Sequence, residues 1–276
     1  MRVPFTPTTP PRFTPTAAAW GSRRLAAEGA HIATCDMNAE SMEETKALCL
    51  AANPSVTVTT ARCDVSQEAE VLAWRDSVAA EHDTARLALF NNAGIAGGQS
   101  FVADPRSQWE LTFSVCWGGT YNCCRAFMPM LVGSEQGAVV NTSSINGFYG
   151  AHCATPHTAY ASAKHAIKGF SEALIGDLRL NAPHVKGFCV MPGAIATDIV
   201  ANSVILNPIP GKTPSPSLIE RARAVNMDDP GAMSAADAAE VIINGVRHNK
   251  WRILVGKEPA HSSLRSVHCF PANISG

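Results

Sequence analysis

Residues 139–144 read Val-Val-Asn-Thr-Ser-Ser, and further along the chain residues 160–164 read Tyr-Ala-Ser-Ala-Lys. The first stretch ends an apolar run that is typical of a buried strand, and the second lies in a segment with helical periodicity. Because residues four apart lie on one face of a helix, the Tyr160 phenol and the Lys164 ammonium are neighbours. A strand that ends in hydroxyl side chains and leads to such a helix is the unit on which our interpretation of the fold rests.

The pairing of Tyr160 with Lys164 has a definite chemical use. A free phenol has a pKa near ~10, and an adjacent fixed cation favours the phenolate and lowers that pKa. The phenol then becomes a usable general acid and base, and the Ser144 hydroxyl can hold a carbonyl or alcohol oxygen in line with it. Taken alone, the same spacing also describes a solvated lysine beside a half-buried tyrosine, so the surrounding sequence has to decide.

Short apolar runs alternate with helical patterns along the rest of the chain. The expected strands are His31–Cys35, Val56–Val65, Leu87–Asn91, Ala138–Thr142, Val185–Val190 and Arg252–Val255. The expected helices are Glu40–Ala51, Gln67–Glu81, Gln108–Leu131, Ala159–Leu180 and Ala235–Val246. This alternation indicates an α/β fold with a parallel sheet covered on both faces, and such sheets bind ligands at the carboxyl ends of their strands.

Five separate signals in this order resemble the short-chain dehydrogenase/reductase family, over roughly residues 20–256. They are Cys63-Asp64-Val65, Asn91-Asn92-Ala93-Gly94, Val139 to Ser144, Tyr160 to Lys164, and Pro192-Gly193 followed by Thr197. The resemblance implies a Rossmann-like, doubly wound parallel sheet flanked by helices. It also implies that Tyr160 is the proton donor and acceptor, that Ser144 orients the substrate oxygen, and that Lys164 binds the nicotinamide ribose and lowers the Tyr160 pKa. Hydride then moves between the cofactor and a substrate carbon.

The resemblance further implies an NAD cofactor. Asp36 closes the second strand of the family fold, where a carboxylate binds both adenosine ribose hydroxyls and repels a 2′-phosphate, and the following Met37 supplies no compensating arginine. The alternative for Asp36 is an ordinary turn aspartate at the surface. The remaining residues expected to bind the cofactor are Asp64, Val65, Asn92, Ala93, Gly94, Tyr160, Lys164, Pro192, Gly193, Ile195 and Thr197.

The beginning of the chain departs from the family pattern. The family has a glycine-rich phosphate loop, T-G-x-x-x-G-x-G, after an opening strand, whereas residues 11–18 contain no glycine and residues 3–10 carry prolines at 4, 7 and 10. Proline cannot donate the ladder bonds of a central strand, so we expect a degraded first strand and phosphate loop. The expected organisation is therefore an atypical Pro/Thr-rich head at 1–20, one Rossmann-like domain at 21–256 and an irregular tail at 257–276.

A second departure is Cys116, which stands where the family pattern has asparagine. That asparagine distorts its helix and holds a water that links the lysine to solvent, and a thiol is a poor substitute because it is a weak donor and acceptor. Two functions stay open on these grounds. One is an oxidoreductase that moves hydride between NAD(H) and an apolar secondary alcohol or ketone. The other is a catalytically impaired or inactive member of the family that keeps only oligomer or ligand-binding surfaces.

Composition narrows the partners and the location. The formal charge of −1 gives no reason to expect a nucleic-acid or anionic-membrane partner, so small molecules are the expected ligands. Nine cysteines without CxxC pairs predict buried thiols and no metal site, and without a membrane span or signal-peptide core we expect a cytoplasmic protein. The resemblance implies a homodimer or homotetramer through the helices 108–131 and 159–180. Residues 195–232 are expected to form a mobile, apolar lid over the substrate.

Overall fold

A seven-stranded parallel sheet forms the centre of the protein, in the order β3-β2-β1-β4-β5-β6-β9. The computed structural model describes residues 7–9, 17–97, 100–150, 156–207, 213–227 and 229–256. The strands are β1 (Pro7–Thr9), β2 (Ile32–Asp36), β3 (Val58–Arg62), β4 (Arg86–Asn91), β5 (Gln136–Thr142), β6 (Val185–Pro192) and β9 (Arg252–Val255). The predicted α/β class and parallel sheet are confirmed.

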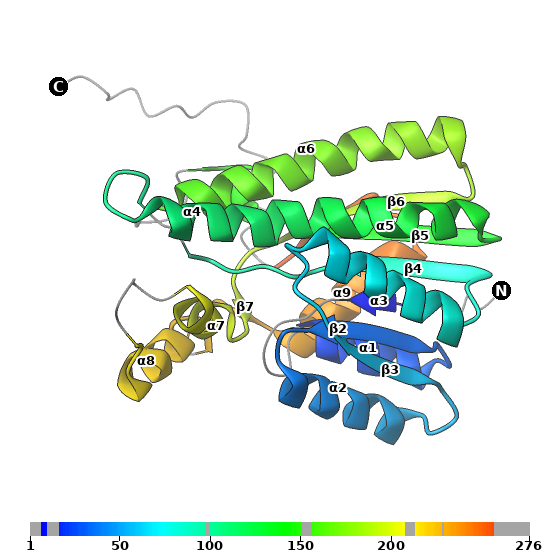
Figure 1. Ribbon diagram of the computed structural model, residues 1–276, viewed down its shortest axis with the longest axis horizontal. Coiled ribbons are helices and arrows are strands. Elements are labelled where there is room, and N and C mark those ends of the chain that lie inside the picture. The colour runs from blue at the N-terminus through cyan, green and yellow to red at the C-terminus, as the bar shows by residue number, and fades with distance from the viewer. Residues whose placement is uncertain are drawn as a thin grey trace.

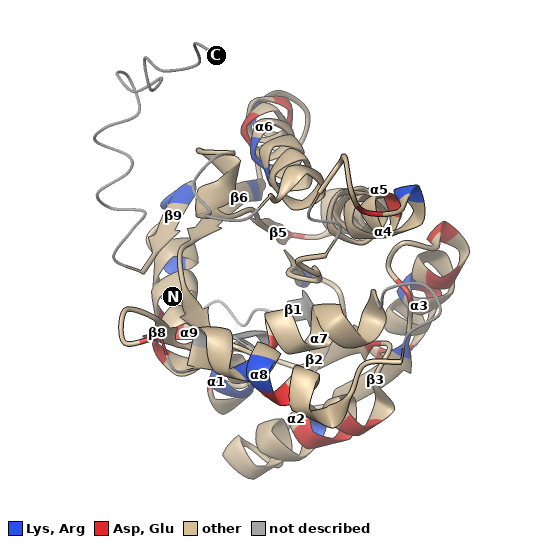
Figure 2. Cartoon of the chain, turned by 90° about the vertical axis from the view of Figure 1, so that its left-hand side faces the viewer, with Lys and Arg blue, Asp and Glu red and all other residues tan. Residues whose placement is uncertain are grey.

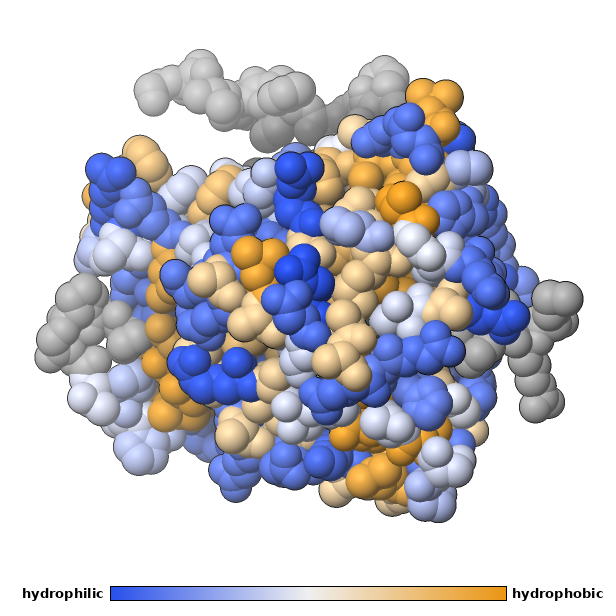
Figure 3. Space-filling model, turned by 45° about the vertical axis from the view of Figure 1, so that its right-hand side comes forward, coloured by the Kyte–Doolittle hydropathy of each residue, from blue (hydrophilic) through white to orange (hydrophobic). Residues whose placement is uncertain are grey.

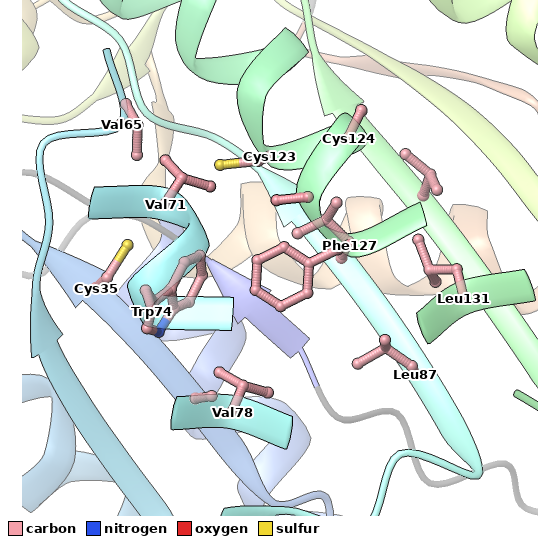
Figure 4. Packing of buried hydrophobic residues seen from close by; sticks show 14 of the residues in the cluster. Cys35, Val65, Val71, Trp74, Val78, Leu87, Cys123, Cys124, Phe127 and Leu131 are labelled. Atoms are coloured by element: carbon pink, nitrogen blue, oxygen red, sulfur yellow. The ribbon is translucent and has the colours of Figure 1, made fainter. Parts of the chain in front are cut away.

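Helices cover both faces of this sheet (Figure 1). One face is covered by α3 (Glu68–Glu81), α4 (Arg106–Phe113), α5 (Gly119–Gly133) and α6 (Thr158–Asn181). The other face is covered by α1 (Ala17–Ala27), α2 (Ala39–Ala52) and α9 (Ala235–Arg247). The largest core cluster lies under α3 and α5, where Trp74 and Phe127 meet edge to face with ring centroids 5.0 Å apart (Figure 4). These packed layers bury the sheet on both of its faces.

The central strand β1 is present but short. We expected a degraded first strand in residues 3–10, and the short strand at Pro7–Thr9 agrees with that expectation. Thr8 pairs with Ala33 of β2 on one side and with Leu89 of β4 on the other. Proline is tolerated here because it is the first residue of the strand, where its missing N–H removes a bond at the end of the ladder only. The strand has three residues, against five in β2 and six in β4.

Two expected elements differ from those observed. The helix expected at Gln108–Leu131 is divided by a π-helical turn at Ser114–Gly118, between α4 and α5. The segment 195–232, expected to be a mobile lid, contains α7 (Ile199–Leu206) and α8 (Pro216–Met227). It begins with β7 (Ile195–Ala196), which pairs in parallel with β8 (Met233–Ser234). Residues 208–212 of this segment, and the expected tail 257–276, lie outside the described residues.

Apolar side chains on the surface are scattered. On the face seen in Figure 3 they form separate patches among hydrophilic residues. Exposed apolar residues include Tyr121 and Val132 of α5 and Leu180 of α6. These are the two helices through which we expected subunits to contact each other, and the oligomer stays a prediction. Within the described ranges, every helix is too short or too polar to cross a lipid bilayer.

Candidate active site

The carboxyl ends of β4, β5 and β6 lie along one edge of the sheet, and α6 begins at the same edge (Figure 1). Figure 2 views the molecule from that side and shows α7 and α8 in front of the sheet. The residues that follow these strands are the ones for which the sequence predicted chemistry. Among the described residues, no group of three or more His, Cys, Asp or Glu side chains is placed to hold a metal ion.

Lys164 is buried at this edge, with only 3% of its surface exposed. Its Nζ donates a hydrogen bond to the Thr142 carbonyl oxygen at the end of β5, at 2.8 Å, and lies 5.4 Å from the centre of the Tyr160 ring. Burial lowers the pKa of the Lys164 ammonium, and the Cys116 and Cys189 thiols act in the opposite direction. The structure therefore brings Tyr160 and Lys164 together, as their spacing predicted.

Ser144 is the second residue after β5, the strand whose Thr142 carbonyl binds Lys164. Its Oγ accepts a hydrogen bond from the Asn146 backbone N–H at 3.2 Å, in the short 3₁₀ turn Ile145–Gly147. A hydroxyl oxygen that accepts such a bond still has its own O–H to donate. This local turn fixes the Ser144 oxygen, and its remaining donor suits a carbonyl or alkoxide oxygen.

The residue before it, Ser143, has a structural role for which we made no prediction. Its Oγ donates to the Lys164 backbone carbonyl at 2.7 Å, which ties the end of β5 to the middle of α6. Gly147 packs directly against this hydrogen bond, because a Cβ at position 147 would lie 2.4 Å from the Ser143 Oγ and 2.9 Å from the Lys164 carbonyl oxygen. The spacing Ser-x-x-x-Gly after the strand was the available signal for this contact.

Cys116 lies in the π-helical turn beside Lys164. Its Sγ donates to the Ile95 carbonyl oxygen at 3.3 Å, and a Cβ on Gly94 would lie 3.4 Å from that sulfur and 3.6 Å from the Lys164 Nζ. Gly94 thus allows the thiol and the ammonium to approach the same stretch of backbone. Single π turns inside α-helices occur frequently at functional sites. That the Cys116 thiol is a poor substitute for the expected asparagine stays a prediction.

At the other end of the site, Asp36 ends β2 with 1% of its surface exposed. Its Oδ1 accepts from the Asn38 backbone N–H at 2.9 Å, and Asn38 in turn caps α2. The alternative, an ordinary turn aspartate at the surface, is therefore ruled out. The sequence-based argument also assumed no compensating arginine, whereas the register places Arg62 of β3 opposite Asp36. The Arg62 guanidinium pairs with Glu70, Nη1 to Oε2, at 3.2 Å.

The remaining residues expected to bind cofactor follow the strands as predicted. Asp64 Oδ1 accepts from the Ser66 N–H at 3.0 Å and from its hydroxyl at 2.8 Å, and the Val65 carbonyl accepts from Asn122 of α5 at 3.0 Å. Asn92 Oδ1 accepts from the Thr142 hydroxyl at 3.3 Å. Ala93 packs against the main core. Pro192 ends β6, and the N–H of the next residue, Gly193, donates to the Val255 carbonyl oxygen at 2.9 Å. Ile195 lies in β7, and Thr197 comes just after that strand.

Helix α7 is fastened to the loop after β4 and to α4. The Ser203 Oγ accepts from the Ala96 N–H at 2.7 Å. Asn207, at the end of α7, donates through Nδ2 to the Gln108 carbonyl at 3.0 Å, and Gln108 donates through Nε2 to the Asn207 carbonyl at 3.3 Å. Asp198, just before α7, forms an ion pair with Arg223 of α8 at 3.0 Å. These bonds fasten α7 to the loop after β4, to α4 and to α8, and the mobility expected for this segment stays a prediction.

The model of the short chain dehydrogenase family matches residues 19–205. The chain belongs to the short-chain dehydrogenase/reductase family. The putative oxidoreductase SadH of Mycobacterium tuberculosis is 31% identical to it over 235 residues, which cover 85% of this chain and 80% of that protein. Levodione reductase of Leifsonia aquatica is 33% identical over 191 residues, 66% of each chain. The predicted family is thereby confirmed, and it is a family of oxidoreductases.

Solved structures of this family share the fold. A short-chain dehydrogenase/reductase from Burkholderia phymatum in complex with NAD has a TM-score of 0.80 at 23% identity, over 96% of this chain and 94% of that one. An alcohol dehydrogenase from Thermococcus sibiricus complexed with 5-hydroxy-NADP has a TM-score of 0.68 at 17% identity, over 98% of this chain and 100% of that one. The structural neighbours thus include both cofactor types.

The residues of this short-chain dehydrogenase/reductase fit a nicotinamide dinucleotide at two points. At the adenosine end, the buried Asp36 carboxylate follows β2, where it suits ribose hydroxyls. At the nicotinamide end, Lys164 uses one N–H for Thr142 and has further donors for a second ribose. The expected loss of the phosphate loop concerns residues 11–18, of which 11–16 lie outside the described residues.

Proposed function

We propose that this short-chain dehydrogenase/reductase transfers hydride between NAD(H) and an apolar secondary alcohol or ketone. The observation that supports this most directly is the buried Lys164 ammonium, which the Thr142 carbonyl holds within 5.4 Å of the Tyr160 ring. Keeping a lysine at 3% exposure is unfavourable unless other groups use its charge. A phenol one helical turn away is such a group.

Three side chains carry the proton and orient the substrate in this proposal. Ser144 donates its O–H to the substrate oxygen, because its own oxygen is already held by the Asn146 N–H. Tyr160 gives a proton to that oxygen during reduction and takes one from it during oxidation. Lys164 favours the phenolate form of Tyr160 and offers its remaining N–H groups to a ribose. When bound, a nicotinamide accepts or supplies the hydride.

The preference for NAD over NADP rests on Asp36, whose buried carboxylate repels a 2′-phosphate.

A cytoplasmic location is supported by the described cysteines, which are free and buried, as thiols in a reducing compartment are. A homodimer or homotetramer through α5 and α6 is supported by their exposed apolar residues, and light scattering after gel filtration measures it. Asp64, Val65, Asn92, Ala93, Gly94, Pro192, Gly193, Ile195 and Thr197 complete the proposed cofactor site.

The first prediction tests the proton transfer. We expect Tyr160→Phe to lower kcat on a panel of apolar ketones and alcohols by roughly 10²–10⁴-fold, the usual contribution of a positioned acid and base. Its affinity for NADH, measured by fluorescence titration, should change little because only one hydroxyl is removed. Lys164→Ala should lower both kcat and NADH affinity. The matched control is Tyr121→Phe, on the exposed part of α5, which should keep full activity.

Full turnover in Tyr160→Phe would remove the proton-transfer role. A wild-type protein that binds NADH tightly and turns over nothing on the panel would instead favour the second function, an impaired member of the family. The substitution of Cys116 for the expected asparagine is the observation that favours this second function.

A further inference from the structure

His157 lies beside Tyr160 at the start of α6. It is the residue that precedes the helix, and its carbonyl accepts the bond from the Ala161 N–H at 2.8 Å. His157 comes three residues before Tyr160, which is about one helical turn, so the two side chains lie on the same face of the helix. The two ring centroids lie 6.4 Å apart, with the planes tilted by 59°. Tyr160 is therefore flanked by an ammonium on one side and by an imidazole on the other.

The surrounding contacts hold His157 in this place. The next residue, Thr158, accepts a hydrogen bond at its Oγ1 from the Trp109 indole N–H of α4, at 3.1 Å. Trp109 is stacked on Phe113, with ring centroids 5.3 Å apart. Further along α6, Lys164 is bound to Thr142. Because the helix is tied to the protein on both sides of Tyr160, the imidazole has a fixed position relative to the phenol.

His157 directly precedes α6, so it lies at the edge of the sheet where that helix begins. Helix α6 begins at the carboxyl edge of the sheet, where α7 and α8 stand in front of the strands (Figure 2). Burial lowers the pKa of His157, so the ring is neutral at neutral pH. A neutral imidazole has one N–H donor and one acceptor nitrogen, and it binds a hydroxyl or a carbonyl oxygen without favouring an anion.

We propose that His157 contacts the substrate and selects compounds that carry a second oxygen on the carbon next to the reacting one. The substrate class is then a vicinal diol, an α-hydroxyketone or a vicinal diketone on an apolar body. Oxygens on adjacent carbons are close enough to be bound by two side chains whose rings are 6.4 Å apart. The proposal rests on the proposed function, in which Tyr160 and Ser144 bind the reacting oxygen.

A pair of matched substrates tests this assignment. For wild-type protein and variants we would measure kcat/KM for butane-2,3-dione and for butan-2-one. We expect His157→Phe to lower the ratio of the two values by about tenfold, mainly through KM of the diketone, because one polar contact is lost. His157→Gln, which keeps a donor and an acceptor, should restore most of the ratio. The matched control is His165→Gln, an exposed residue of the same helix, which should leave the ratio unchanged. An unchanged ratio in His157→Phe would overturn the proposal.

A second measurement does not depend on turnover. The imidazole resonances of the wild-type protein would be followed by NMR while butane-2,3-diol or butan-2-ol is added in the presence of NAD, with His157→Gln used to assign the signal. We expect the His157 signal to shift with the diol and much less with the monoalcohol. Equal shifts, or none, would overturn the role of His157. If neither ketone is turned over but the His157 signal shifts selectively with the diol, the proposed function would be wrong and the role of His157 in binding would stand.

Discussion

At the scale of single residues, the sequence predicted that Tyr160 and Lys164 lie together, but not the contacts that hold them in place. The spacing of Tyr160 and Lys164 predicted their contact, because helical periodicity fixes it. The bond from Ser143 to the Lys164 carbonyl depends on how α6 packs on β5, which a local pattern does not contain. Arg62 was missed beside Asp36 for the same reason, since strand register is a long-range property.

Asp36 carries the prediction on cofactor choice. We expect the wild-type protein to bind NADH more tightly than NADPH, and Asp36→Ser to weaken NADH binding by roughly 10–100-fold, because charge-assisted bonds to ribose are lost at about 1.5–3 kcal/mol each. NADPH binding should improve, with Arg62 available on the adjacent strand. Fluorescence titration with both cofactors measures this, and Asp83→Ser, at an exposed turn before β4, is the control. Tighter binding of NADPH by the wild type would disprove the role of Asp36.

His82 predicts a dependence of stability on pH. Its ring is buried, with one nitrogen 2.8 Å from the Thr59 hydroxyl, and burial together with the nearby His31 lowers its pKa. The unfolded chain, with a pKa near ~6.5, then binds more protons than the folded one, so stability increases with pH up to that value and is lost on acidification.

Urea denaturation at several pH values measures this effect. His82→Gln should flatten the profile below pH ~6.5, whereas His165→Gln, at an exposed site, should leave it as in the wild type. A profile that stays equally steep in His82→Gln would mean that other groups cause the loss.

At the scale of elements, regular helices and strands were predictable where the periodicity was long. The strand Arg252–Val255 has the expected bounds, and α6 extends one residue beyond the expected helix at each end. Helices α7 and α8 were missed because the prolines in residues 195–232 were taken as evidence against regular structure. Instead, Pro216 is the first residue of α8, a position that tolerates a missing N–H.

The contact between the turn after β5 and α6 gives a prediction for Gly147. A Cβ there would overlap the Ser143 Oγ and the Lys164 carbonyl, so Gly147→Ala should destabilise the protein by about 1–3 kcal/mol, as overpacking of a core does. We also expect a fall in kcat, because Lys164 would shift relative to Tyr160. Thermal unfolding and steady-state kinetics measure both effects. Gly150→Ala, where a Cβ meets nothing within 4 Å, is the control and should behave as the wild type. Equal behaviour of both variants would mean that Gly147 does not fix this contact.

At the scale of the whole molecule, the unusual feature is the head. The sequence predicted a degraded first strand, and the structure retains three residues of it between β2 and β4. We expect replacement of residues 1–16 by a five-residue strand and T-G-x-x-x-G-x-G to raise Tm by about 2–4 °C for each kcal/mol gained. NADH affinity should increase as well, because glycines let a pyrophosphate approach the start of α1. Equal Tm and equal affinity of the two proteins would show that the native head already serves both purposes.

The short β1 lies between two parts of the sheet. One part contains β2, β3, α1 and α2, and the other contains β4, β5, β6 and β9. They are joined through three residues of β1, through the main core cluster, in which Ala33 and Cys35 of β2 lie with Leu87 and Leu89 of β4, and through the ion pairs Arg24–Glu240 and Arg247–Glu28 at α1 and α9. Amide hydrogens of β2 should therefore exchange with solvent faster than those of β5, by sub-global opening at a free energy below that of complete unfolding. A protein of this architecture would lose β2, β3, α1 and α2 first while the half that contains Tyr160 stays folded.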